Sequence, residues 1–294
     1  MRFYRYAEAL IYLRIPDTVE YQTTPIVIKG LRVSFTITKK LGWGTNPATI
    51  KIWNLSADHR NAINNFGDRI TIVAGYLEAE ENGALQILYT GETIAVSHIF
   101  EQPDIVSVFE CGDGDRYLNN SRVAVSFSAE TPVRTIIQNV ANQMGIEFVE
   151  FADSVNVAYQ QGFSNIGTSK DALANLCTRL NLQFSVQNNQ LQIIPIDGTV
   201  TRPPVEINQT TGMQGVPQRY TRRLQDTYEA ANAPRTGYKV RTMLNPLILP
   251  GYPVVLTSSH LGINKANFRV ESLTHDGDTF GPIWSTQLDM TEIA

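Results

Sequence analysis

The sequence predicts a mostly β protein with a small α/β insertion, in which two β-barrel domains flank a pair of helix–strand units. Short strand patterns fill the first hundred or so residues and return in the last hundred or so, while amphipathic helical patterns gather between them. Two pairs of segments also resemble each other within the chain. We therefore expect a first barrel at residues 1–125, an insertion at 126–200 and a second barrel at 201–294.

The composition limits the classes of protein that fit. The chain has 294 residues and a net charge of −4 without a long basic run, which argues against tight binding of nucleic-acid phosphates. Its two cysteines, Cys111 and Cys177, are too few for a disulfide framework, so a reduced cytoplasmic setting is expected. No apolar stretch approaches about 18 residues, and the N-terminus lacks a small-residue cleavage site, so we expect neither a membrane span nor a signal peptide.

The first β region is indicated by alternation. Residues 33–40, VSFTITKK, alternate β-branched or aromatic residues with polar ones, which is typical of a half-buried strand. A turn at 42–49 and a strand at 50–55 should follow. Ser56 is a candidate N-cap for a short helix with Ala62, Ile63 and Phe66 on its apolar side, ending at Gly67. Further strands are expected at 69–76, 85–91, 93–100 and 104–113.

Two helices are predicted in the insertion, each with recognisable residues at its start and end. In residues 131–145, Thr131 should cap the helix, Pro132 fits its first position and Gly145 can close it. Its apolar stripe comprises Val133, Ile136, Ile137, Val140 and Met144. In residues 168–181, Thr168 and Asp171 form a capping-box pattern and Asn181 can end the helix. The second stripe comprises Leu173, Leu176, Cys177 and Leu180.

Two internal similarities suggest repeated units. NVANQMGIEF at 139–148 resembles NLCTRLNLQF at 175–184, each a helix running into a strand. In the β regions, Gly67 opens GDRITIV and a later strand ends at His98, while Gly251 opens GYPVVLT and a later strand ends at His275. The second similarity predicts that the two β regions are copies of one domain.

The segment RVESLTHDGDTFGPIWSTQLDM, residues 269–290, places His275, Asp276 and Asp278 close together. Three such donors can bind a divalent ion, but catalytic sites gather ligands from separate segments. Asp-Gly also favours a turn, and Asp side chains cap their own loops. We expect a hairpin turn here, followed by a strand that buries Trp284, Leu288 and Met290.

Other candidate chemistry is weaker. ECGDGDRY, at 110–117, resembles half of a Ca²⁺ loop but lacks a spaced third ligand and a closing Glu. Cys111 could be a nucleophile, although a free Cys is more often a small core residue. QRYTRRLQD, at 218–226, could be a basic contact patch or a solvated face. We expect no catalytic residue, no metal and no cofactor.

Several motifs together resemble a known family. IKIWNLSADHRNAI followed by GDRITIVAGY is similar to the start of baseplate hub proteins of contractile-tailed bacteriophages, the tail-tube-like hub family. LNPLILPGYPVVLTSS and then FRVESLTHDGDTFGPIWSTQLDM are similar to that family's last barrel. The order of these motifs matches over most of the chain. The first 25 residues match no part of the pattern.

The resemblance implies a structural, non-enzymatic virion protein of the tail baseplate, assembled in the host cytoplasm. It implies a homotrimer in which two tail-tube-like barrels per chain give a pseudo-sixfold ring. That ring would join the hexameric tail tube to a central trimeric spike and let DNA pass through its channel. Tape-measure and baseplate wedge proteins are further expected partners, no membrane is expected, and any wall-digesting activity is expected in another protein.

Two alternatives remain open at this point. One is a carbohydrate- or receptor-binding β module at a tail tip, which would need Trp43, Trp53 and Tyr76 exposed in a groove. The other is a metal hydrolase centred on His275 and Asp278. Each requires the named side chains to come together in space.

Overall fold

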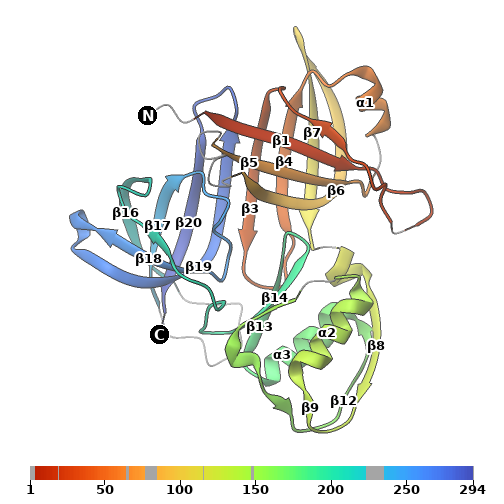
Figure 1. The fold of residues 1–294 in the computed structure, drawn as a ribbon, viewed down its shortest axis with the longest axis vertical. Helices are drawn as coiled ribbons and strands as arrows, with labels where there is room; N and C mark the ends of the chain where they lie inside the picture. The colour runs from red at the N-terminus through yellow and green to blue at the C-terminus, as the bar shows by residue number, and fades with distance from the viewer. Residues whose placement is uncertain are drawn as a thin grey trace.

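One large sheet dominates the protein. The computed structural model describes residues 4–18, 20–63, 66–76, 85–114, 116–146, 149–222 and 235–293. Thirteen strands form a single sheet, whose main path runs β16-β17-β20-β19-β3-β4-β7-β6-β5-β1-β2, and three small sheets lie apart from it. Figure 1 shows the large sheet above and to the side of a smaller helix-containing part. The mostly β class with a small α/β insertion is therefore confirmed.

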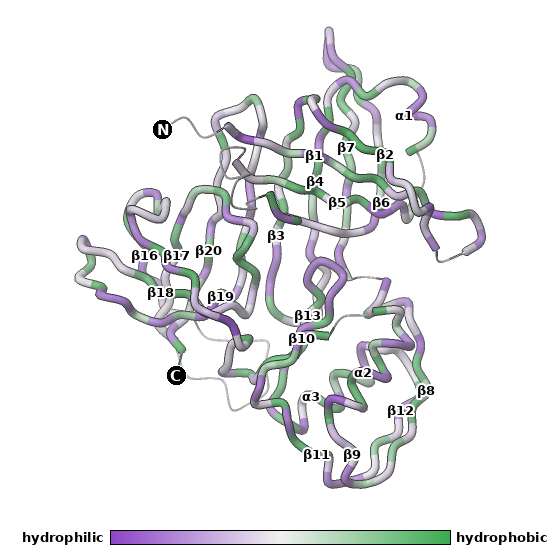
Figure 2. The backbone as a smooth tube through the Cα atoms, viewed as in Figure 1, coloured by the Kyte–Doolittle hydropathy of each residue, from purple (hydrophilic) through white to green (hydrophobic). Residues whose placement is uncertain are grey.

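The first half of the large sheet comes from the N-terminal part of the chain. Its strands are β1 (Arg5–Tyr12), β2 (Ile26–Ile28), β3 (Val33–Lys40), β4 (Asn46–Trp53), β5 (Arg69–Tyr76), β6 (Gln86–Glu101) and β7 (Asp104–Asp113). Helix α1 (Ala57–Ala62) joins β4 to β5. Along β3 and β4 every second side chain is buried, as the alternation predicts, and Figure 2 shows apolar and polar residues alternating along these strands.

The C-terminal part of the chain supplies the second half. Its strands are β15 (Val205–Ile207), β16 (Met213–Arg222), β17 (Arg235–Met243), β18 (Pro253–Ser258), β19 (Ile263–Asp278) and β20 (Trp284–Glu292). All of them pair antiparallel except β15, which runs parallel to β18. Trp284, Leu288 and Met290 of β20 are buried, as expected.

The insertion lies between the two halves in sequence. It contains strands β8 (Arg122–Phe127), β9 (Thr131–Pro132), β10 (Val149–Phe151), β11 (Ala158–Tyr159), β12 (Phe163–Thr168), β13 (Leu182–Gln187) and β14 (Gln190–Pro195), and helices α2 (Val133–Met144) and α3 (Ser169–Arg179). The predicted apolar stripe of α2 is fully buried, and that of α3 is buried except for the half-buried Leu180. No helix in the described ranges is long and apolar enough for a membrane crossing.

Three clusters of buried hydrophobic residues stabilise these parts. One fills the insertion, and each half of the large sheet has its own. Leu244 and Trp284, from the C-terminal half, belong to the cluster of the N-terminal half, so the two halves share core residues. The domain boundaries at 125 and 200 stay a prediction.

The predicted helix caps and helix ends are confirmed in part. Ser56 and Thr168 cap their helices through side-chain oxygens, and Gly145 and Asn181 take positive φ at the helix ends. The cap at Thr131 is wrong, because α2 begins after Pro132 and the Thr131 hydroxyl donates to Ser128 O instead.

Three element boundaries also differ from the prediction. The turn at 42–49 is shorter, because β4 already begins at Asn46, whose side chain is buried and hydrogen-bonded. Helix α1 stops at Ala62, and Phe66 is 72% exposed instead of packing inward. The two strands expected at 85–91 and 93–100 are one strand, β6, which continues through a β-bulge.

Candidate functional site, the seam between two repeated sheets

The two halves of the large sheet contain the same five-stranded arrangement. The first arrangement has the strand order β3-β4-β7-β6-β5, and the second has the order β16-β17-β20-β19-β18. In both arrangements, every strand is antiparallel to its neighbours. The long strands β6 and β19 both have 16 residues. We call these arrangements sheet A and sheet B.

The match extends to single hydrogen bonds. Gly67 and Gly251 both take positive φ, 88° and 85°, just before β5 and β18. The Gly67 N–H donates to Thr93 O at 2.9 Å, and the Gly251 N–H donates to Val270 O at 2.8 Å. A β-bulge follows at once in both long strands, between Thr93 and Ala95 and between Val270 and Ser272. Equal backbone detail at these positions supports the predicted repeat.

His98 and His275 occupy matching positions beyond the bulge. His98 Nδ1 lies 2.9 Å from Ser107 Oγ of β7, and His275 Nδ1 lies 2.8 Å from Thr286 Oγ1 of β20. Each histidine lies directly opposite its partner in the strand register. The sequence similarity that ended at these two residues therefore reflects a repeated structural contact.

Sheet A and sheet B join along a seam between β3 and β19. Residues 272–278 of β19 pair antiparallel with residues 34–40 of β3, with His275 opposite Ile37. This pairing makes one continuous sheet from two repeats, because β19 uses one edge for β20 and the other for β3. Both edges of β19 are hydrogen-bonded along this stretch.

Side chains reinforce the seam on the face that carries Asp276 and Asp278. Arg32 donates to Asp278 through Nε, at 3.2 Å, and through Nη2, at 2.7 Å, and it also covers the Trp53 ring at 4.3 Å. The Thr36 hydroxyl donates to Asp276 Oδ1 at 2.8 Å. The Arg32 contact holds the pKa of Asp278 below its ordinary value despite partial burial.

The seam explains the cluster of His275, Asp276 and Asp278 without a metal. Adjacent residues of a strand point to opposite faces, and His275 is fully buried while Asp276 and Asp278 are engaged by Thr36 and Arg32. Within the described ranges, no group of three metal-ligating side chains comes together. The structure therefore gives this cluster a role in strand pairing.

The expected hairpin is present, because β19 pairs with β20, but its turn comes after Asp278 and His275–Asp278 all belong to β19. Gly277 does not take positive φ. Its role is steric, since a Cβ there would lie 2.3 Å from Phe35 Cζ. The expectation that an Asp caps the loop is confirmed, because Asp278 Oδ1 accepts the Phe280 N–H at 3.0 Å.

His275 is held as a neutral imidazole. Burial lowers its pKa well below the ordinary value, and the nearby charge of Lys39 lowers it further. No described group forms a hydrogen bond with Nε2. A buried ring of this kind suits a packed seam and cannot reach a substrate in solution.

A buried polar anchor ties the insertion to sheet A. The tip of the β13–β14 hairpin carries Asn188, whose Oδ1 accepts from Lys39 Nζ at 2.5 Å and from the Thr90 N–H at 3.2 Å. Asp113 accepts the N–H groups of Asn188 and Asn189 at 2.6 and 3.1 Å. Burial raises the pKa of Asp113 to about 6 although Lys39 opposes this, and burial lowers the pKa of Lys39 to about 8.

This anchor corrects one sequence hypothesis. Asp113, in the Ca²⁺-loop-like stretch 110–117, ends a strand and binds the insertion hairpin. Asp115 of that stretch lies outside the described residues. Cys111 is buried, and burial raises the pKa of its thiol far above the usual range, which suits a core residue and not a nucleophile.

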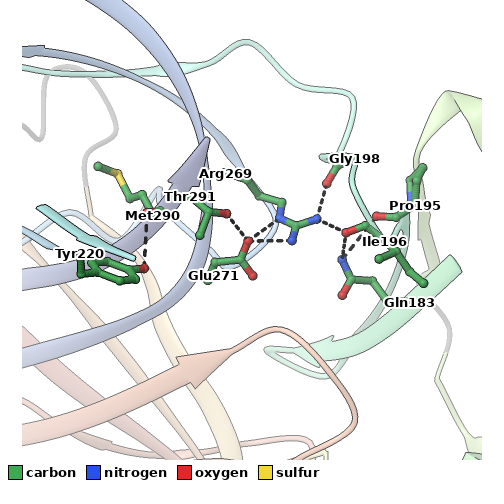
Figure 3. Close-up of polar contacts among 9 residues, drawn as sticks. All are labelled: Gln183, Pro195, Ile196, Gly198, Tyr220, Arg269, Glu271, Met290 and Thr291. Carbon is green, nitrogen blue, oxygen red and sulfur yellow. Dashed lines mark hydrogen bonds and ion pairs between the residues drawn. The ribbon is translucent and has the colours of Figure 1, made fainter. Parts of the chain in front are cut away.

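A second buried contact ties the insertion to sheet B (Figure 3). Arg269 of β19 donates to Glu271 Oε1 through Nε at 2.8 Å and Nη2 at 2.6 Å, and both side chains are almost fully buried. Arg269 Nη1 donates to the carbonyl oxygens of Ile196 and Gly198. Residues far apart in the sequence thus fix the insertion against both repeats.

The aromatic residues of the carbohydrate-binding alternative do not share a groove. Trp43 packs edge-on against Phe184 of the insertion, with ring centroids 5.8 Å apart. Trp53 lies under Arg32 at the seam, and Tyr76 packs against the core of sheet A. The basic segment 218–226 is described only as far as Arg222, where it forms β16; the rest lies outside the described residues.

Comparisons with known proteins identify the family of the chain. The family model described as "Baseplate hub gp41" matches residues 13–262. Comparison with curated proteins found no match. The fold is similar to a 43 kDa tail protein of prophage MuSo2 from Shewanella oneidensis, with a TM-score of 0.62 and 13% identity over 97% of this chain and 98% of that one.

Two further structures share the fold. A tail protein from Neisseria meningitidis MC58 gives a TM-score of 0.63 at 13% identity, over 97% of this chain and 96% of the other. The E. coli c3393 protein gives 0.57 at 11% identity, over 90% and 74%. It is described as a component of the type VI secretion system with structural similarity to the T4 bacteriophage tail proteins gp27 and gp5. Because the family model covers most of the sequence, the chain belongs to the baseplate hub gp41 family, a family of structural phage tail proteins.

Proposed function

We propose that three copies of this chain form a baseplate hub that adapts the sixfold tail tube to a threefold central spike. The single observation that carries the proposal is the repeat of one five-stranded arrangement within the chain. Three chains with two such sheets each would present six similar sheets, so a threefold ring could mate with a hexameric tube.

The repeat is not perfect, and that suits an adaptor. Sheet A carries β1 and β2 beyond β5, whereas sheet B carries the parallel strand β15 beside β18. The part of the ring built from the five common strands would then have nearly sixfold symmetry. The part that carries β1, β2, β15 and the insertion would have threefold symmetry. Spike, tape-measure and wedge proteins would bind the threefold parts.

The partners follow from this geometry and from the relatives. The likeness to c3393, described as similar to gp27 and gp5, and to a Francisella PdpA–VgrG complex, with a TM-score of 0.56, supports a place next to a spike. We place the assembled protein in the virion tail after assembly in the host cytoplasm, with DNA passing through its channel. A net charge of −4 suits transit, because like charge does not hold phosphate.

We assign the chain no catalytic role. His275 and Cys111 are buried, and Asp276 and Asp278 contact Thr36 and Arg32 across the seam. Lys39 and Asp113, whose pKa values depart from the ordinary ones, contact the hairpin of the insertion. Activity in cell-wall digestion would belong to another component of the baseplate.

Electron-microscope images of the purified complex, averaged along its axis without imposed symmetry, test the proposal. A ring of six similar lobes with threefold differences at its rim is the expected view. A ring with six identical lobes, or a particle without rotational symmetry, would contradict it.

A further inference from the structure

We propose that the outer half of β6 in one copy pairs antiparallel with β16 of a second copy, so that the contact between chains repeats the seam within each chain. The inference rests on the proposed trimer in one respect, namely that the partner is another copy of this chain. It goes further by naming the two edges, their direction and their register.

The intramolecular seam is the template. There, β19 continues past its bulge and offers residues 272–278 to β3 of sheet A. Strand β6 of sheet A corresponds to β19 of sheet B, and β16 of sheet B corresponds to β3 of sheet A. A contact of the same kind between two copies would therefore pair β6 of one copy with β16 of the other. Within one chain these two strands do not pair.

The outer half of β6 is unpaired on one side in the described structure. Strand β5 pairs with β6 only from Gln86 to Glu92, whereas β7 pairs along Glu92–Glu101. On β19, β3 occupies this edge; on β6, no described strand pairs with the matching edge from Ile94 to Glu101. A long edge of this kind readily accepts a further strand.

A side chain on the open edge of β6 is exposed, whereas its counterpart on β19 is covered by the seam. His275 is 0% exposed under the seam, whereas His98 is exposed. Ile94, Ile99 and Phe100 are 53%, 46% and 65% exposed on the outer half of β6. Apolar side chains on an open edge would be covered by a second copy.

The other edge belongs to β16. It ends the order of the large sheet among the described strands and pairs with β17 alone. When the strand registers are followed across sheet A and sheet B, residues 218–222 of β16 take the same positions in sheet B as residues 36–40 of β3 take in sheet A. Transferring the seam register then places Ile99 opposite Gln218, His98 opposite Arg219 and Val96 opposite Thr221.

The geometry suits a ring. Figure 1 shows β16 and the outer end of the β6–β7 hairpin on different sides of the molecule. A contact between two different surfaces is heterologous, and it closes into a ring when the rotation allows. Three such contacts would alternate with three intramolecular seams around six sheets.

Disulfide trapping tests the register in the full chain. The double variant Ile99→Cys/Gln218→Cys places two thiols opposite each other, where antiparallel partners lie about 4.5–5.5 Å apart between Cα atoms, within disulfide reach. The matched control is Ile99→Cys/Thr221→Cys, whose second thiol lies about 10 Å further along the strand and on its other face. Cys111 and Cys177 are buried and stay in place.

After mild oxidation, we expect covalent species of two and three chains in the first variant, at least about tenfold more than in the control. Native mass measured on the same samples separates the outcomes. Particles of three chains without the disulfide, or with equal trapping in both variants, would overturn the strand pairing and leave the trimer intact. A monomer in both variants and in the wild type would overturn the trimer as well.

A charge on the edge provides a second test that does not depend on cysteine chemistry. His98→Lys should weaken assembly about tenfold or more while the monomer stays folded, because the matching residue His275 is fully covered in the seam and the transferred register sets residue 98 opposite Arg219. Ile166→Lys is the control, because Ile166 is 89% exposed on the insertion. Unchanged assembly of His98→Lys would contradict the proposal.

Discussion

His98 and His275 lie at matching points of two copies of one strand, each with Nδ1 within 2.9 Å of a hydroxyl on the next strand, yet only His275 is covered by a third strand. The pair shows the repeat and its asymmetry at once. One copy of the edge is filled within the chain, and no described strand fills the other.

The buried pair of Arg269 and Glu271 should be sensitive to removal of one partner. Glu271→Gln leaves the Arg269 guanidinium buried without its counter-ion, so we expect the free energy of unfolding to fall by about 3 kcal/mol. Urea unfolding followed by circular dichroism measures this. Arg202→Met, which removes the more exposed ion pair with Glu150, is the control and should cost about 1 kcal/mol or less. Equal losses would contradict this account of the anchor.

Acid should weaken the seam through His275. The folded state keeps this ring neutral, since its pKa lies well below the ordinary 6.5, whereas the unfolded chain takes up a proton near that value. Stability is therefore present above about pH 6.5 and is lost as the pH falls below it. His275→Gln should be less stable at pH 8 but should lose less between pH 7 and 5. His260→Gln, at an exposed site, should keep the wild-type slope in the same urea titrations.

Asp113 should give the opposite trend. Its folded pKa, about 6, lies above the ordinary 3.8, so the folded state holds the proton more tightly. Stability should then fall as the pH rises from about 4 to about 6, by an amount on the order of 3 kcal/mol from this group. Asp113→Asn should abolish that part of the slope, while Asp153→Asn, at an exposed site, should not. An unchanged slope in Asp113→Asn would mean that the carboxyl titrates normally.

Gly277 should tolerate no side chain. An added Cβ would lie 2.3 Å from Phe35 Cζ, and the Phe35 ring packs edge-on against Trp284, so it cannot move freely. We expect Gly277→Ala to lower the free energy of unfolding by about 1–3 kcal/mol. Gly167→Ala, in β12, is the control because its nearest neighbour would be 3.9 Å away. A neutral Gly277→Ala would contradict a steric role.

Much of the fold was predictable from local patterns. Alternation identified β3, and the stripes and end residues identified α2 and α3, because each of these elements buries one face against a core. The sequence similarity that ends at His98 and His275 also predicted the repeat. Its glycines and histidines make backbone and hydroxyl contacts that both copies need.

Other features depend on contacts between distant segments. The pairing of β3 with β19 decides that His275–Asp278 is strand, although Asp-Gly favours a turn locally. The roles of Lys39, Asp113 and Arg269 depend on the insertion hairpin and its following segment, which no local pattern places there. The polarity of these three residues in strand positions was the one available signal, since buried charges are rare without partners.

The mass of the purified complex tests the central claim most directly. Native mass spectrometry of the full chain should give a particle of three times the 32.8 kDa chain mass. That result would fit three pairs of repeated sheets around one axis. A particle of one, two or six chains under the same conditions would contradict it.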